Sequence, residues 1–346
     1  MTNCPRPLRA TALTLAAALT LSAAPAYAEG ELNLYSSRHY DTDERLYSDF
    51  TDATGITINR IEGNADELIE RMRAEGANSP ADVLLTVDTT RLERAKDAGI
   101  LQPVESEVLN ERIPENLRDA ENEWFGFSQR ARIVFYDEND VAEPPRTYLD
   151  LADPRFEGLV CSRSSTNVYS QTLLAAMIEN HGEDAARDWA EGVVRNFARA
   201  PQGGDTDQLR AIVSGECDVS LSNTYYFARA LRTEVDGLGE EERAGIAWVF
   251  PTMSETAGSH VNLSGGGVAR HAPNRENAVK FLEYLASDQA QSYFSAGNDE
   301  YPAVPTVEVS ASVQQLGPLE ADPVNLSNVA KNVAAAQRIF AEVDWQ

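Results

Sequence analysis

Residues 32–40 have the sequence LNLYSSRHY, in which a short apolar strand from Leu32 to Tyr35 is followed directly by a polar turn. Two later segments share this design, GLVCSRSSTNVY at residues 158–169 and VSLSNTYY at residues 219–226. In each segment, polar side chains follow the strand and one or two tyrosines come next. Because ligands in open α/β sheets bind beyond the carboxyl ends of the strands, these strand ends predict a ligand site rich in tyrosine.

The chain around these segments alternates apolar strands with amphipathic helices. Asn64 is predicted to cap a helix with four apolar residues on one face, and Asp205-Thr206 is predicted to cap another. The other main strands are expected at residues 82–86, 132–136 and 246–250, and the other main helices at residues 89–98, 170–180 and 273–285. This alternation predicts an α/β fold with largely parallel sheets.

The first 28 residues have the features of a secretory signal peptide. Arg6 and Arg9 precede an uncharged apolar run over residues 10–24, and Ala26-Tyr27-Ala28 provides the small residues that a signal peptidase recognises. The run is too short to span a bilayer, so we expect cleavage, a mature chain that begins near Glu29, and a periplasmic protein that is not inserted in a membrane.

Charge and cysteine content limit the classes of partner. The formal net charge is −26 at pH 7, so the surface should repel nucleic acid and anionic lipid. Adaptation to a salty habitat explains such acidity as well as a role in ligand binding does. Cys161 and Cys217 remain after signal-peptide removal, and the sequence leaves open whether they form a disulfide or two buried thiols.

The side chains at the three strand ends suggest which metal they could bind. A tyrosine in such a place is often a hydrogen-bonded wall residue, so the pattern alone leaves a structural role open. If Tyr40, Tyr169, Tyr225 and Tyr226 bind a metal, the hard phenolate oxygens suit Fe³⁺, because only a strongly charged cation displaces a proton from a group with a pKa of about 10. Zinc and copper would require more ligands like His39 or cysteine, and calcium would require carboxylates.

The sequence resembles the periplasmic iron(III)-binding proteins of ABC importers, the ferric-binding-protein family, and especially its cyanobacterial FutA-like branch. The resemblance covers almost the whole mature chain, and its most specific feature is the combination of SSRHY with a tyrosine pair. It is carried by residues 34–40, by Arg163-Ser164-Ser165 with Tyr169, and by residues 201–208, 222–226 and 264–267.

The resemblance implies a class II-like, two-lobed substrate-binding protein with its ligand in the cleft between the lobes. The implied Fe³⁺ ligands are Tyr169, Tyr225 and Tyr226 from the second lobe and His39 and Tyr40 from the first. A synergistic anion such as carbonate could complete the metal shell. Arg38 and Arg130 are expected beside the ligands, where their charge would offset the phenolates. The implied partners are the permease and ATPase components of an ABC transporter, and we expect a monomer.

We expect lobe 1 to comprise residues 29–130 and 255–300, and lobe 2 to comprise residues 131–254 and 301–346. An alternative function is binding of a small organic or phosphorylated anion by the same fold, because Arg38, Arg130 and Arg163 could clamp such a ligand. The sequence has no GxSxG or HExxH motif, which argues against an enzyme.

Overall fold

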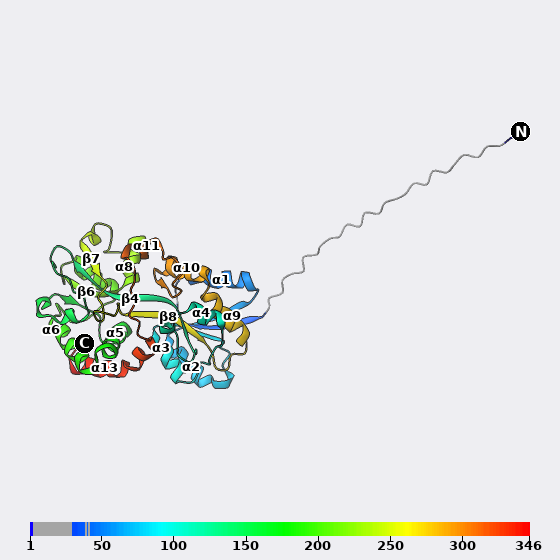
Figure 1. The fold of residues 1–346 in the computed structure, drawn as a ribbon, viewed down its shortest axis with the longest axis horizontal. Helices are drawn as coiled ribbons and strands as arrows, with labels where there is room; N and C mark the ends of the chain where they lie inside the picture. Colours follow the sequence, from blue (N-terminus) through cyan, green and yellow to red (C-terminus); the bar gives the residue numbers. More distant parts are fainter. Residues whose placement is uncertain (3–29, 39, 41) are drawn as a thin grey trace.

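The computed structural model describes residues 1–2, 30–38, 40 and 42–346. The predicted signal peptide and His39 therefore lie outside the described residues. The folded part is elongated, with α1, α2, α4 and α9 at one end and α6, α8, β6 and β7 at the other (Figure 1). Within the described ranges, no helix is both long and apolar enough to cross a membrane.

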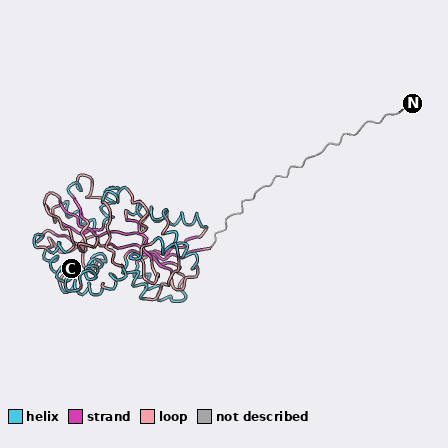
Figure 2. The backbone as a smooth tube through the Cα atoms, viewed as in Figure 1, coloured by secondary structure: helices cyan, strands magenta, loops and turns pink. Residues whose placement is uncertain are grey.

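The strands form a nine-stranded sheet in the order β2-β1-β3-β8-β4-β6-β5, and β7 and β9 also pair with β4. Figure 2 shows the strands as a band along the long axis, with helices beside it. The strands are β1 (Glu31–Ser36), β2 (Thr57–Glu62), β3 (Val83–Val87), β4 (Phe125–Asp137), β5 (Val160–Cys161), β6 (Val219–Asn223), β7 (Ile246–Val249), β8 (Val261–Val268) and β9 (Tyr301–Pro302).

The long strand β4 connects the two ends of the molecule. Its first half pairs with β8 as far as Ala131↔Val261, and its second half pairs with β6 from Arg132↔Asn223. The predicted lobe boundary between residues 130 and 131 thus falls within a continuous strand, and the division into lobes stays a prediction. Because side chains alternate along a strand, Arg130 and Arg132 share one face of β4, and Gln129 lies on the other.

The expectation of largely parallel sheets was wrong. β1 pairs in parallel with β2 and β3, and β5 pairs in parallel with β6. All pairings of β4, and the pairing of β3 with β8, are antiparallel. The fold is therefore α/β with a mixed sheet, because long-range strand pairs made by β4 and β8 join two regions of parallel βαβ units.

Helices follow most strands and cover the sheet. The α-helices are α1 (Asp43–Thr54), α2 (Ala65–Glu75), α3 (Thr89–Asp97), α4 (Glu107–Arg112), α5 (Val168–His181), α6 (Glu183–Arg195), α7 (Asp205–Val213), α8 (Thr224–Arg232), α9 (Arg275–Leu285), α10 (Asp288–Asn298), α11 (Ala311–Leu316), α12 (Leu326–Lys331) and α13 (Val333–Glu342). Short 3₁₀ helices occupy Gly76–Asn78, Glu115–Leu117, Leu149–Ala152, Pro154–Phe156 and Glu242–Gly245. As predicted, Asn64 caps α2, where its side chain accepts a hydrogen bond from the backbone of Asp66.

Cys161 and Cys217 form a disulfide, which the sequence left open. Cys161 ends β5, and Cys217 lies two residues before β6, the strand that pairs with β5. Their Cα atoms are 5.9 Å apart, which is within the range that a disulfide requires. The bond therefore fixes the two parallel strands whose ends carry Tyr169 and the Tyr225–Tyr226 pair.

This bond predicts a change in stability. Replacing both cysteines with alanine should lower the free energy of unfolding by about 2–5 kcal/mol, because the unfolded chain loses a cross-link. Chemical denaturation of the wild type, the double variant and the thiol-reduced wild type measures this effect. Reduction should bring the wild type close to the variant, and identical unfolding curves for all three would contradict the prediction.

Candidate metal site

Three of the four predicted tyrosine ligands occupy the first turns of two helices. Tyr169 is the second residue of α5, and Tyr225 is the second residue of α8, followed by Tyr226. The side chain of Asn167 starts α5 by accepting a hydrogen bond of 3.0 Å from the backbone N–H of Tyr169. Because α5 and α8 follow the neighbouring parallel strands β5 and β6, both helix N-termini lie at the same edge of the sheet.

The tyrosines meet at this edge. The hydroxyl oxygens of Tyr169 and Tyr225 are 3.2 Å apart, and the rings of Tyr225 and Tyr226 stack with centroids 4.2 Å apart. Tyr40, which follows β1, lies close to the other tyrosines. A negative charge on Tyr40 would raise the pKa of Tyr225, and one on Tyr169 would raise the pKa of Tyr40. We call Tyr40, Tyr169, Tyr225 and Tyr226 the tyrosine cluster.

Burial raises the pKa of three phenols of this cluster, those of Tyr40, Tyr225 and Tyr226. Burial, and then the charges of neighbouring tyrosines, raise the pKa of Tyr225 well above its ordinary value. Burial and the carboxylate of Asp205 raise the pKa of Tyr226 to about 12. Burial and Glu300 likewise raise the pKa of Tyr40. A cation that binds these oxygens as phenolates must therefore displace protons, and a hard, highly charged ion does this best.

Two helix N-termini lower the free-energy cost of removing protons from these phenols. The first backbone N–H groups of α5 and α8 give this region a positive potential, which favours negative charge on nearby oxygens. The effect acts on Tyr169, Tyr225 and Tyr226, because all three lie in a first helical turn. The site thus combines buried and half-buried phenols with fixed dipoles that would stabilise phenolates if a metal ion replaced the protons.

The predicted arginines lie beside the cluster. The guanidinium carbon of Arg38 is 4.9 Å from the ring centroid of Tyr40, and that of Arg130 is 5.7 Å from that of Tyr169. Burial by itself would lower the pKa of Arg38, but Asp43 and Glu300 raise it, so the side chain stays charged. Within the described part of the chain, Nε and Nη2 of Arg130 are buried and have no hydrogen-bond partner.

The prediction that Asp205 caps a helix was wrong. Gly204, not Asp205, is the N-cap residue of α7, and the backbone N–H of Gly204 donates to Asp207 over 2.7 Å. The buried carboxylate of Asp205 instead accepts hydrogen bonds of 2.7 Å from both Arg132 and Arg163. A cap and a buried ion pair place the same residue type at a helix start, so the local sequence could not separate them.

Arg163 is a further arginine beside the tyrosine cluster. Its guanidinium carbon is 5.5 Å from the ring centroid of Tyr169, on which Arg130 also acts. From the sequence, the role expected for Arg163 was that of a clamp for an anionic ligand. Its position directly after β5, in the same segment as Tyr169, was the signal that could have placed it beside the cluster.

Other donor sets do not compete with the tyrosines. Among the residues that the structure describes, no three His, Cys, Asp or Glu side chains gather in a way that could hold a metal ion. His260 is buried, and burial followed by the charges of Arg132 and Arg130 lowers its pKa to about 3, so it is neutral. The structure does not test the proposed role of His39, which lies outside the described residues.

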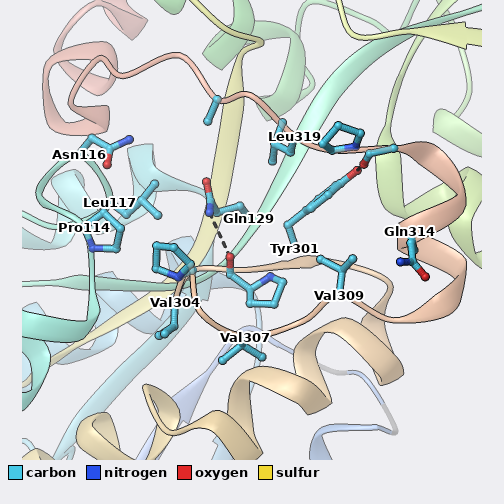
Figure 3. Close-up of a pocket in the computed structure, with 16 residues that line it drawn as sticks. Pro114, Asn116, Leu117, Gln129, Tyr301, Val304, Val307, Val309, Gln314 and Leu319 are labelled. Atoms are coloured by element: carbon cyan, nitrogen blue, oxygen red, sulfur yellow. Dashed lines mark hydrogen bonds between the residues drawn. The ribbon is translucent and has the colours of Figure 1, made fainter.

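A sizeable cavity lies away from the tyrosine cluster. It has a volume of about 600 Å³ and is lined mainly by apolar residues from residues 301–321, together with Pro114, Leu117 and Gln129 (Figure 3). Gln129 donates a hydrogen bond of 3.1 Å to the carbonyl of Pro302 at this cavity. Since Gln129 and Arg130 lie on opposite faces of β4, the cavity and the tyrosine cluster are on opposite sides of that strand.

Comparison with known proteins gives a consistent picture. A sequence profile described as "Bacterial extracellular solute-binding protein" matches residues 78–319. The chain is similar to "Iron uptake protein A1" of Synechocystis sp., with 49% identity over 91% of this chain and 88% of that protein. A more distant relative is the "Fe(3+)-binding periplasmic protein" of Serratia marcescens, with 26% identity over 81% of this chain and 80% of that protein.

A solved structure is similar over nearly the full length. It is described as Trichodesmium FutA (IdiA) in complex with iron and citrate ligands. The TM-score is 0.87 and the identity is 49%, and the match covers 92% of this chain and 100% of that one.

The phenol environment predicts an abnormal titration. In the metal-free protein, the difference in ultraviolet absorbance between the wild type and Tyr226→Phe should show an ionisation near pH 12, because burial and Asp205 raise the pKa of Tyr226. A tyrosine in solution ionises at a pKa of about 10. An ionisation of Tyr226 at or below that value would show that its hydroxyl faces solvent.

Proposed function

The chain belongs to the bacterial extracellular solute-binding protein family, and from this premise we propose that it binds ferric iron in the periplasm and delivers it to an inner-membrane ABC transporter. The contact of 3.2 Å between the hydroxyls of Tyr169, which is half-buried, and Tyr225, which is buried, carries the proposal, because phenols that converge in this way form a set of hard oxygen donors. Iron is the cargo of the protein rather than a resident cofactor.

The proposed ligands are the tyrosine cluster and His39. Tyr169, Tyr225 and Tyr226 are the core of this set, because they project from two adjacent helix N-termini. Four phenolates and a neutral imidazole around Fe³⁺ would carry a net charge of about −1, since each phenolate contributes one negative charge. The buried, charged side chains of Arg38 and Arg130 support this arrangement by offsetting that charge.

An anion could complete the metal shell. Two N–H groups of Arg130, on Nε and Nη2, are buried without a hydrogen-bond partner in the described part of the chain. A carbonate or carboxylate oxygen bound to iron would match these donors. The relative from Trichodesmium, whose structure is described as a complex with iron and citrate ligands, is consistent with an anion that binds together with iron.

An anion without a metal is the weaker alternative. Arg38 already donates through Nε and Nη2 to Asp43, over 2.9 and 3.0 Å. Arg163 donates through Nη1 to Asp205 over 2.7 Å. A clamp built from these arginines would have to break both ion pairs, whereas the tyrosine hydroxyls already converge.

The remaining roles follow from the family. Solute-binding proteins of this kind pass their ligand to a permease driven by an ATPase, and we propose the same partners here, with the protein acting as a monomer. The named relatives are uptake and binding proteins, so we propose that this chain performs no catalysis.

The first prediction from this function concerns colour. Phenolate bound to Fe³⁺ gives a broad visible charge-transfer band, so the protein should become coloured when ferric citrate is added. Tyr225→Phe and Tyr226→Phe should each remove most of the colour and weaken iron binding at least ten-fold, because a phenyl ring cannot act as a ligand.

Tyr284→Phe is a matched control for these variants. Tyr284 lies on α9, its ring packs against Phe50, and its hydroxyl is buried without a hydrogen-bond partner in the described part of the chain. The control should keep both the colour and the affinity. Full colour in the Tyr225→Phe and Tyr226→Phe variants would show that the pair is structural.

The second prediction concerns pH. The phenols hold their protons in the metal-free protein and lose them when iron binds, so binding releases protons and the affinity falls as the pH falls. For each proton released, the affinity should change about ten-fold per pH unit. Competition with a chelator of known protonation behaviour measures the slope, which Tyr226→Phe should reduce by about one. A pH-independent affinity between about pH 6 and pH 8 would contradict phenolate ligation.

A further inference from the structure

Asp299 and Glu300 are consecutive carboxylates, and both are buried, with exposed fractions of 0% and 1%. They lie between α10 and β9, the short strand that pairs with β4. Burying two adjacent carboxylates is costly unless each is paired with a positive charge. Neither residue belongs to the proposed iron ligands, so their arginine partners show what the pair does.

Asp299 holds helix α8. Arg232 at the end of α8 donates two hydrogen bonds to it, from Nε over 2.9 Å and from Nη2 over 2.8 Å, and Ser312 donates a third over 2.7 Å. Arg229 on the same helix is 3.8 Å from this carboxylate. The guanidinium carbon of Arg229 is also 5.7 Å from the ring centroid of Tyr225, one turn earlier. Asp299 thus fixes the helix that presents Tyr225.

Glu300 holds the arginines on the other side of the cluster. One of its carboxylate oxygens is 3.7 Å from Arg38, and the other is 3.7 Å from Arg130. Arg38 lies over the ring of Tyr40, and Arg130 lies over the ring of Tyr169. Arg38 and Arg130 come from segments that are far apart in the sequence. Because Glu300 lies near both, it fixes the position of Arg38 relative to Arg130.

We propose that the Asp299–Glu300 dipeptide positions the tyrosine cluster, by anchoring on two adjacent residues the arginines that lie against Tyr40, Tyr169 and Tyr225. The inference rests on the proposed function, because the cluster matters here as an iron site. Both carboxylates act through arginines and do not contact the iron. They set the relative positions of ligands from three separate segments.

The geometry suits this task. Asp299 has a left-handed backbone conformation, with φ at 61°, where it ends α10, and the chain then turns into β9. The ion pairs of Glu300 are longer than hydrogen bonds, so it balances charge without occupying the arginine donors. Within the described residues, Nη1 of Arg38 and Nε and Nη2 of Arg130 stay free of hydrogen bonds. The arginines are thereby held in place and keep N–H groups available to the site.

The test compares Glu300→Gln with Glu93→Gln. Glu300→Gln keeps the size of the side chain and removes its charge. Glu93 is a matched control, because its buried carboxylate accepts hydrogen bonds from Trp124 and Ser327 and has no arginine partner in the described residues. Iron dissociation into excess citrate, the maximum of the charge-transfer band and the midpoint of thermal unfolding are measured for both variants.

Glu300→Gln should release iron roughly ten-fold faster than the wild type and shift the band maximum, because the ligands lose their common anchor. Glu93→Gln should lower the unfolding midpoint and leave both iron readouts unchanged. Asp299→Asn should act in the same direction as Glu300→Gln, through α8. If Glu300→Gln matches the control in dissociation rate and band maximum, the inference is wrong.

Ser128→Ala gives a milder form of the same test. Ser128 donates a hydrogen bond of 2.6 Å to Glu300, so its loss should loosen the carboxylate without removing a charge. If Glu300→Gln does not fold, Ser128→Ala decides the matter, with a smaller shift in the same direction expected and wild-type behaviour overturning the inference. If the wild type itself never becomes coloured with ferric iron, the proposed function is wrong and this inference falls with it.

Discussion

The hydroxyl oxygens of Tyr169 and Tyr225 lie 3.2 Å apart because α5 and α8 begin from neighbouring parallel strands. Parallel pairing of β5 with β6 sends both chains out of the sheet at the same edge, and each chain starts its helix within a few residues. The disulfide between Cys161 and Cys217 fixes this pair of strands. Tyr226 and Tyr40 lie near these two hydroxyl groups, and Arg38 and Arg130 bring positive charge to the same region.

The electrostatic design of the site contrasts with the rest of the surface. The chain has a formal net charge of −26, yet buried arginines surround the tyrosine cluster. Each of these arginines is paired with a carboxylate, as Arg38 is with Asp43 and Arg132 is with Asp205. Buried ion pairs of this kind add little net stability, because desolvation cancels much of the attraction. Their value here is to keep positive charge beside oxygens that become anionic only when a cation arrives.

The proximity of the tyrosines that follow β5 and β6 could be predicted from the sequence, because the signals for it are local. A strand, a polar turn and a tyrosine lie within about ten residues, and the rule for ligand positions in α/β sheets relates one strand end to another. The sequence could not predict the antiparallel pairings of β4 and β8 or the disulfide. Those features depend on distances between residues far apart in the chain, such as the 5.9 Å between the Cα atoms of Cys161 and Cys217. Glu300 was missed for the same reason, since its partners Arg38 and Arg130 lie at least 170 residues away, at positions 38 and 130 of the sequence.

The most direct test of the central claim, that Fe³⁺ binds to tyrosine phenolates between α5 and α8, is a crystal structure of the iron-loaded protein with anomalous diffraction recorded at the iron absorption edge. We predict one strong anomalous peak within bonding distance of the hydroxyl oxygens of Tyr169, Tyr225 and Tyr226. An iron peak bound elsewhere, for example at carboxylates of the acidic surface, with these three hydroxyls still in contact only with one another, would contradict the account.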